Sequence, residues 1–321
     1  MDRFKILVSA PYVQQDIERF LPLFEKYNLD VDIPPVNERM EESQLMEIIS
    51  RYHGVISGDD RITENVFKEA GKLKVISKWG TGIDSIDSKA AAKYNVKVCN
   101  TPNAFSVPVS DTVLGFILNF SRNITASDQE MKNGEWIKIK GKTLNEQTLG
   151  IIGLGNVGEQ VAKRANAFGM KIIVNDIRPL SNYIIEQLEI EIVSKDVLYE
   201  RSDFISINCD LNEISYHLLS EKEFEMMSKV PFIINTARGP IINQDDLIKA
   251  LENKYIAGAG LDVFEFEPLP VESPLRKMKN VFLASHNSNS SPKYWEKVHI
   301  NTFNNLLNGL YGTDKIWIDS L

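Results

Sequence analysis

Short apolar runs alternate with segments of helical periodicity along the first hundred residues of this chain. Five runs have the length and composition of buried strands: 5–10, 29–33, 54–58, 73–77 and 96–100. Between them, apolar residues recur at the spacing of one helix face at 14–27, 43–52, 63–70 and 85–94. Because repeated strand–helix units of this length place parallel strands side by side, they predict a parallel sheet with helices on both faces.

The same alternation begins a second time at residue 149, after a turn at 101–103 and a helix at 109–121. The expected strands are 149–153, 170–175, 203–208, 232–235, 256–261 and 281–284, and the expected helices are 156–168, 245–253 and 291–310. A chain of 321 residues is too long for one comfortable core. We therefore predict an α/β protein with two doubly wound parallel-sheet domains. The helix at 109–121 is apolar on most sides, so we expect it to be buried between domains or subunits.

The overall composition argues against several classes of protein. The net charge is −8 and no basic run stands out, so nucleic acid and anionic membranes are not expected partners. No segment has the length of a membrane span or the pattern of a signal peptide. Cys99 and Cys209 lie in or beside apolar runs, and the four histidines are scattered. We expect reduced thiols, a cytoplasmic protein and no metal site.

A glycine-rich motif joins the first strand of the second half to its helix. Residues 149–158 read LGIIGLGNVG, with Gly153, Gly155 and Gly158 in the pattern G-x-G-x-x-G. After a strand, the first glycine permits a tight turn, the second lets the backbone approach a pyrophosphate, and the third allows close helix packing. The helix that begins at Asn156 offers the free N–H groups of Asn156 and Val157 to the phosphates. This context predicts dinucleotide binding, the alternative being a structural glycine turn in another strand–helix fold.

An acidic residue stands where the next strand ends. Asp176 closes the run KIIVND, at the position from which a carboxylate binds the adenosine ribose hydroxyls and repels a 2′-phosphate. The expected cofactor is therefore NAD. Arg178 leaves NADP as the alternative, because a guanidinium so close by suits a phosphate.

Four ionisable residues follow apolar strands in the second half of the chain. They are Arg238 in NTARGP, Asp262 at the end of IAGAGLD, Glu267 in FEFEP, and His286 after VFLAS. Ligands of such sheets bind at the carboxyl ends of the strands, so we expect these side chains beside the cofactor. An arginine can hold a carboxylate bidentately and polarise its carbonyl, and a histidine can donate the proton that a new hydroxyl needs. A glutamate next to the histidine orients it and favours its protonated form.

Other residues compete for two of these roles. We expect His53 at the surface, His217 in a loop that leads into a helix, and His299 in the packing of the last helix. His286 alone follows an apolar strand into a polar loop, which favours it as the acid. FEFEP contains two glutamates, so Glu265 remains an alternative partner for the histidine.

The motifs GLGNVG, NTARGP and GLDVFEFEP, with the histidine after VFLA, resemble those of the D-isomer-specific 2-hydroxyacid dehydrogenases. The resemblance covers nearly the whole chain, and its four motifs occur in the family's order. It implies a Rossmann NAD-binding domain at 103–289, inserted into a flavodoxin-like, discontinuous substrate-binding domain at 1–102 plus 290–321. In appearance the chain is most similar to 3-phosphoglycerate dehydrogenases without a regulatory domain. Because the sequence ends at Leu321, we expect no feedback regulation through such a domain.

The resemblance also implies roles for individual residues. The catalytic residues would be Arg238, which also binds substrate, Glu267 and His286. The cofactor would be bound by the glycine motif, by Asp176 and by three further residues: Thr236, Ala237 and Asp262. The segment KWGTGID at 78–84 resembles the family's substrate loop. There, Lys78 would face the pocket, and the substrate carboxylate would be bound by the backbone of Gly80, Thr81, Gly82 and Ile83.

The chain departs from the family pattern in two places. Asn287-Ser288-Asn289 replaces a glycine-rich segment after the catalytic histidine, so side chains stand where bare backbone usually meets the nicotinamide. Cys209-Asp210-Leu211 replaces a proline after the strand at 203–208 and adds a negative charge near the cofactor. Neither change removes a catalytic group.

The leading expectation is an NAD-dependent D-2-hydroxyacid dehydrogenase that acts reversibly at C2 of a small acid, as a homodimer. A flexible Lys78 ammonium at the pocket rim suits a second anion, which favours 3-phosphoglycerate as substrate. If Lys78 only helps to hold the carboxylate, glyoxylate or hydroxypyruvate is the substrate instead. Two other classes keep the same residues: an NAD(H)-sensing, corepressor-like binding protein, and an enzyme that oxidises formate or phosphite.

Overall fold

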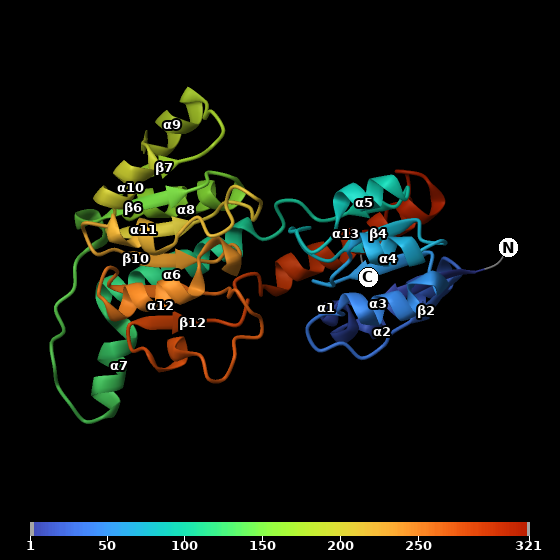
Figure 1. The fold of residues 1–321 in the computed structure, drawn as a ribbon, viewed down its shortest axis with the longest axis horizontal. Helices are drawn as coiled ribbons and strands as arrows, with labels where there is room; N and C mark the ends of the chain where they lie inside the picture. Colours follow the sequence, from blue (N-terminus) through green and yellow to red (C-terminus); the bar gives the residue numbers. More distant parts are fainter. Residues whose placement is uncertain (1–2, 320–321) are drawn as a thin grey trace. The chain divides into compact units, whose positions relative to one another are not determined.

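The computed structural model describes residues 3–319, which divide into two compact units. Unit 1 holds the described residues up to Phe105 together with those from Ser291 onward, and unit 2 runs from Ser106 to Ser290. Each unit consists of one sheet with helices packed on it (Figure 1). All strand pairs within the two sheets are parallel. The expected α/β fold with two parallel sheets is confirmed.

Unit 1 is built on a five-stranded sheet in the order β2-β1-β3-β4-β5, which is the flavodoxin-like order. Its strands are β1 (Phe4–Val8), β2 (Leu29–Asp32), β3 (Gly54–Ser57), β4 (Val75–Lys78) and β5 (Lys97–Cys99). Its helices are α1 (Pro11–Gln15), α2 (Ile17–Lys26), α3 (Glu42–Ile48), α4 (Glu64–Glu69), α5 (Ser88–Lys93) and α13 (Pro292–Tyr311).

The helix α13 returns the chain to the first sheet. The hydroxyl of Ser77 in β4 donates a hydrogen bond of 2.7 Å to the carbonyl of Thr302 in α13. Gly309 lies so close to Val75 that a Cβ at this position would overlap the valine side chain. The ring of Phe303 packs on that of Phe24, with centroids 5.3 Å apart. A missing side chain and a buried aromatic face therefore let α13 lie directly against the sheet.

Unit 2 is built on a seven-stranded sheet in the order β12-β11-β10-β9-β6-β7-β8. Its strands are β6 (Thr148–Ile152), β7 (Lys171–Asn175), β8 (Ile190–Ile192), β9 (Phe204–Ile207), β10 (Phe232–Asn235), β11 (Gly258–Leu261) and β12 (Val281–Leu283). Its helices are α6 (Ser106–Arg122), α7 (Ile124–Lys132), α8 (Asn156–Ala167), α9 (Asn182–Leu188), α10 (Lys195–Arg201), α11 (Glu221–Glu225) and α12 (Gln244–Glu252). The chain runs outward from β6 in both directions, so the order of strands reverses between β6 and β9, where ligands of such sheets bind.

The apolar helix α6 is covered largely inside unit 2. It packs against α8 and β10, and its residues Val113, Leu114 and Ile117 are buried. Phe116 sits over Gly260 of β11, where a Cβ would come within 2.7 Å of the ring. The expectation that this helix is buried between domains or subunits is therefore wrong for these side chains, because α8 and the sheet already cover them.

Five elements of unit 2 were not expected from the sequence: α7, α9, α10, α11 and β8. α7 buries no residue and has few apolar residues, so the sequence gives it no clear helical pattern. β8 is three residues long, and edge strands of this length carry little pattern. No helix within residues 3–319 is long and apolar enough to cross a membrane.

Candidate active site

The glycine motif forms the turn between β6 and α8. Gly153 has a φ of +87°, and a Cβ on it would come within 2.8 Å of the Cys209 nitrogen. A Cβ on Gly158 would overlap the Gly153 carbonyl, so helix and strand can approach only at a glycine. A Cβ on Gly155 would meet only Arg178, 4.0 Å away, so space remains beside its backbone. The turn therefore leaves room for a pyrophosphate at the start of α8, where Asn156 and Val157 have the N–H groups that the helix itself cannot satisfy.

Asp176 follows β7 and is held by the glycine turn. Its Oδ2 accepts a hydrogen bond of 2.7 Å from the Leu154 N–H, and its Oδ1 accepts one of 2.8 Å from the Arg178 N–H. Burial alone would raise the pKa of this carboxyl, but the hydrogen bonds and the Arg178 charge lower it below its ordinary value. The carboxylate is therefore fixed and charged. The guanidinium of Arg178 lies 3.3 Å from it, in an ion pair, while its side chain stays 63% exposed.

The strands that carry the catalytic candidates are neighbours in the sheet. β10 pairs with β11 and β11 with β12, so that Asn235, Leu261 and Leu283 lie in register. Arg238 and His286 follow the two outer strands of this group, and their backbones therefore leave the sheet at the same edge. The structure thus places neighbouring strand ends where the sequence pattern expected them.

The backbone around Arg238 is held by a buried asparagine. The side-chain amide of Asn235 donates to the Arg238 carbonyl at 2.9 Å, and its oxygen accepts the Ala237 N–H at 3.0 Å. The guanidinium itself donates to the Ala237 carbonyl at 2.8 Å. A Cβ on Gly239 would overlap the Phe264 carbonyl, so this loop and the loop after β11 are in backbone contact. The segment NTARGP therefore builds a rigid turn that presents a partly buried arginine.

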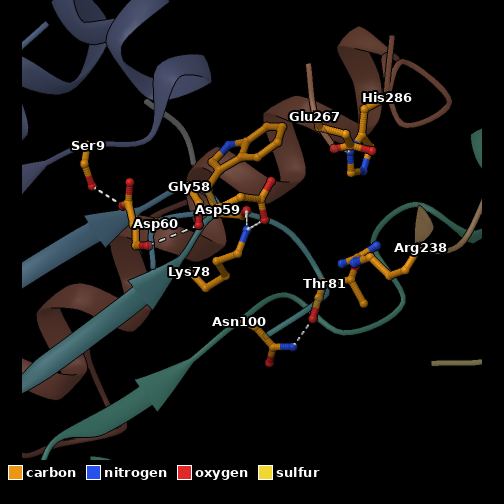
Figure 2. Close-up of polar contacts among 12 residues, drawn as sticks. Ser9, Gly58, Asp59, Asp60, Lys78, Thr81, Asn100, Arg238, Glu267 and His286 are labelled. Atoms are coloured by element: carbon orange, nitrogen blue, oxygen red, sulfur yellow. Dashed lines mark hydrogen bonds and ion pairs between the residues drawn. The ribbon is translucent and has the colours of Figure 1, made fainter. Parts of the chain in front are cut away.

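His286 pairs with Glu267, as Figure 2 shows. Nδ1 of His286 lies 3.0 Å from Oε2 of Glu267, and the other carboxylate oxygen accepts the Phe264 N–H at 2.9 Å. The His286 N–H donates to the Asp262 carbonyl at 2.8 Å, with the histidine at a φ of +54°. Because Nδ1 faces a carboxylate, we assign the proton there, which leaves Nε2 as the atom for proton exchange. The alternative partner, Glu265, instead pairs with His217.

Asp262 is buried and braces the loop after His286. Its Oδ1 accepts the Asn287 N–H at 2.7 Å, and its Oδ2 accepts the Ser288 N–H at 2.9 Å. These bonds fix the segment that replaces the family's glycine-rich loop. Each oxygen keeps a second lone pair, so the expected contact with a nicotinamide amide stays a prediction.

Several buried polar atoms lack partners near the strand ends. Within residues 3–319, no hydrogen-bond partner is found for Oδ1 of Asn208, Oγ1 of Thr236 or Oγ of Ser288. These residues follow β9, β10 and β12, and such groups are costly when they stay unpaired. A polar ligand with donors and acceptors, such as a nicotinamide, suits them. Asn208 was missed from the sequence, although a polar residue directly after a fully buried strand was a usable signal.

Unit 1 contains the segment that resembles a substrate loop. Gly80 has a φ of +115°, and its carbonyl accepts the Thr101 N–H at 2.8 Å. The Thr81 hydroxyl donates to the Thr101 carbonyl at 3.1 Å, and the Asn100 amide donates to the Thr81 carbonyl (Figure 2). These bonds occupy carbonyls and a hydroxyl, so they fix the loop without using its own N–H groups.

Lys78 does not stand at a rim. The residue is 4% exposed, and Nζ lies 3.0 Å from Oδ1 of Asp59 and donates to the Trp79 carbonyl at 3.0 Å. Figure 2 shows the side chain directed to Asp59. The expectation of a flexible, free ammonium is therefore wrong, because the side chain continues from a buried strand and is held by a carboxylate.

The three other histidines have structural partners. Nδ1 of His53 accepts the Lys5 N–H at 3.0 Å. His299 is buried in α13, and its Nδ1 accepts the indole N–H of Trp79 at 3.1 Å. The expected packing role of His299 is thus confirmed, and the bond ties the last helix to the residue before Gly80. Within the described residues, no cluster of side chains suited to a metal ion is found.

The fold and the polar groups of unit 2 define a class: an oxidoreductase with a nicotinamide dinucleotide cofactor. The family described as D-isomer specific 2-hydroxyacid dehydrogenase, NAD binding domain, matches residues 114–288. This protein belongs to that family and acts with NAD on a CH–OH group.

Relatives with assigned names support the family over most of the chain. A hydroxypyruvate reductase of Thermotoga maritima is 35% identical over 94% of this chain and 96% of its own length. A glyoxylate reductase of Thermofilum pendens is 39% identical over 71% of this chain and 69% of its own. The crystal structure of a glyoxylate reductase from Paecilomyes thermophila has a TM-score of 0.83 and 26% identity, covering 97% of this chain and 96% of that one.

Proposed function

We propose that this protein is a glyoxylate or hydroxypyruvate reductase that uses NADH. The observation that carries the proposal is the state of Lys78, which is buried and paired with Asp59. Such a lysine is not available to a remote phosphate, and moving it would leave the Asp59 carboxylate without this partner. The names of similar proteins, glyoxylate reductase and hydroxypyruvate reductase, support the same substrate class.

In this proposal NADH, when bound, supplies a hydride to C2 of the keto acid. Arg238 binds the substrate carboxylate and polarises the carbonyl, because its planar guanidinium can donate two parallel hydrogen bonds. Nε2 of His286 gives its proton to the oxygen that becomes the hydroxyl. Glu267 holds the imidazole through Nδ1 and stabilises its charge before the transfer. The family resemblance further implies that backbone N–H groups of Gly80–Ile83 would bind a carboxylate.

The cofactor would be held by the turn at Gly153–Gly158 and by Asp176. A fixed, charged carboxylate suits the ribose hydroxyls of NAD and repels a 2′-phosphate. Thr236, Ala237 and Asp262 would lie against the nicotinamide. The buried, unpaired hydroxyl of Thr236 supports this placement.

We also propose that the protein is a cytoplasmic homodimer. Four apolar residues on and after α7 are strongly exposed: Ile124 at 55%, Met131 at 51%, Trp136 at 83% and Ile137 at 54%. α7 and the loop after it project from the rest of unit 2 (Figure 1). An apolar surface of this kind is suited to a second copy. Light scattering on the wild type and Trp136→Glu tests the dimer, and a monomeric wild type contradicts it.

The free thiols of Cys99 and Cys209 support the cytoplasmic location, because thiols stay reduced in a reducing compartment.

Steady-state kinetics with NADH test the substrate class. We expect kcat/KM for glyoxylate or hydroxypyruvate to exceed that for 3-phosphohydroxypyruvate by about tenfold or more, or ~1.4 kcal/mol. A preference for the phosphorylated compound would restore the 3-phosphoglycerate assignment. Tight NADH binding with negligible turnover of every 2-keto acid would instead point to a corepressor-like binding protein.

A further inference from the structure

Unit 2 contains a second histidine–glutamate pair close to the first. Nε2 of His217 lies 2.7 Å from Oε1 of Glu265, and the two side chains are only 27% and 18% exposed. His217 has a φ of +50°, a conformation that a side-chain-bearing residue keeps only where its surroundings hold it. The Tyr216 ring stacks on the imidazole with centroids 4.0 Å apart. The mechanism proposed above does not use this pair.

Both members of the pair hold the segment that directly follows Arg238. The His217 N–H donates to the Pro240 carbonyl at 2.9 Å. Oε2 of Glu265 accepts the Gln244 N–H at 3.1 Å, and the Glu265 N–H donates to the Gln244 side chain at 3.3 Å. The segment 240–244 is therefore held at one end by the His217 backbone and at the other by Glu265, and the Leu219 backbone binds it between these points.

The loop that carries Glu265 also touches the arginine turn and the catalytic pair. Gly239 lies against the Phe264 backbone so closely that no Cβ would fit. The Phe264 N–H donates to Oε1 of Glu267, the partner of His286. One short loop thus sets the position of the arginine turn on one side and of the catalytic carboxylate on the other.

We propose that His217 and Glu265 are positioning residues for Arg238. The pair bridges the loop before α11 to the loop after β11, and the arginine turn is fixed between these two backbones. Without the side-chain pair, the two loops lose their direct bond and Gln244 loses the Glu265 carboxylate, while the backbone bonds of His217 and Leu219 to the segment remain. The segment is then held less firmly, and the direction of the guanidinium is less well fixed. The proposal rests on the role given above to Arg238 in binding the carboxylate.

The expected signature is a change in KM larger than the change in kcat. A guanidinium that points in several directions binds the carboxylate less well in the ground state and the transition state alike, which raises KM. Its polarisation of the carbonyl is lost only in part, so kcat falls less than KM rises. We expect His217→Ala and Glu265→Gln each to raise KM for the keto acid about tenfold, with kcat within about threefold. Because both variants remove the same bridge, the double variant is expected to be no worse than either single one.

A conservative variant and a distant pair serve as controls. His217→Gln places its amide nitrogen near the position of Nε2, so it can donate to Glu265 and is expected to restore most of the affinity. Glu191→Gln breaks the Glu191–Arg201 pair, whose two contacts are 2.7 Å each, on the exposed surface of the same unit. We expect it to leave KM unchanged.

Further readouts separate positioning from general damage. NADH binding, followed by fluorescence, should be unchanged in the His217 and Glu265 variants, while oxalate binding to the NADH complex, followed by calorimetry, should weaken by about the factor seen in KM. Oxalate binding needs no turnover, so it tests the inference even if the wild type reduces none of the offered keto acids, a result that would count only against the proposed function. Unchanged KM and oxalate affinity with a lower melting temperature would make the pair merely structural and overturn the inference. Additive losses in the double variant would overturn it as well.

Discussion

Glu267 and His286 lie 3.0 Å apart, while Glu265, only two residues earlier, pairs with a different histidine, His217. The two glutamates of FEFEP thus serve two neighbouring pairs. Both glutamates lie in the loop after β11. The Phe264 N–H donates to the second carboxylate oxygen of Glu267 and so holds this glutamate beside His286. Chemically identical side chains acquire different roles through the path of the backbone alone.

Replacing His286 tests the proton donor. We expect His286→Ala to lower kcat by about 100-fold or more, because general acid catalysis is lost. NADH binding should persist, since the imidazole holds none of the expected phosphate or ribose contacts, and fluorescence titration checks this. A variant with nearly full turnover would show that another group delivers the proton.

A change at Arg238 tests the planar guanidinium. Arg238→Lys keeps the positive charge but loses the two parallel donors, so we expect kcat/KM to fall by about 100-fold, or ~2.7 kcal/mol. Arg201→Lys, in the exposed pair with Glu191, provides the matched control. If both lysine variants retain wild-type efficiency, charge alone suffices and the bidentate role is wrong.

The choice of cofactor depends on Asp176. Asp176→Ala removes the repulsion toward a 2′-phosphate and releases Arg178 from its ion pair. We expect the preference for NADH over NADPH to narrow by about tenfold or more, or ~1.4 kcal/mol. The ratio of kcat/KM values with the two cofactors measures this, with the exposed Asp196→Ala as control. Equal use of both cofactors by the wild type would contradict the assignment.

Lys78 distinguishes a carboxylate-side role from a phosphate-binding role. Lys78→Met removes the buried partner of Asp59, so we expect a lower melting temperature and a similar fractional loss of kcat/KM for hydroxypyruvate and 3-phosphohydroxypyruvate. Lys93→Met, which breaks the exposed pair with Glu64, should change neither property. A selective loss of the phosphorylated substrate would show that Lys78 does reach a phosphate.

The stability of unit 1 should depend on pH through His299. Burial lowers the pKa of this histidine, with Arg19 acting in the same direction, and these effects outweigh Asp16 and Glu296. The unfolded chain then binds more protons just below the ordinary value of 6.5, so stability is present above that pH and is lost as pH falls through the lowered pKa.

The test compares melting temperatures of the wild type and His299→Asn from pH 8 to pH 5. Asparagine keeps an acceptor near the position of Nδ1 for the Trp79 indole, so the melting curves of the two proteins at pH 8 should have similar shapes. We expect the wild type to lose more stability on acidification than the variant. Parallel curves over the whole range would show that His299 does not contribute to the pH dependence.

The fold class, the glycine turn and the types of chemical group at the strand ends could be predicted from the amino-acid sequence. These features are local: a buried parallel strand needs a continuous apolar run, and a tight turn against a helix needs glycine at particular spacings. The places of Gly158 and Arg238 in the fold could be recognised for this reason, because the residues beside them in the sequence indicate the local structure.

Features that depend on contacts between residues far apart in the sequence could be found only in the folded protein. The sequence predicts Lys78 as a cation at the pocket rim, yet its side chain is buried and pairs with Asp59, which follows the neighbouring strand. The sequence predicts a cofactor contact for Asp262, and only the structure shows that its carboxylate also accepts two N–H groups from a loop 25 and 26 residues further on. The sequence shows which chemical groups the chain carries. Which of these groups pair depends on the fold, because a charge acts over a few ångströms whatever its distance along the chain.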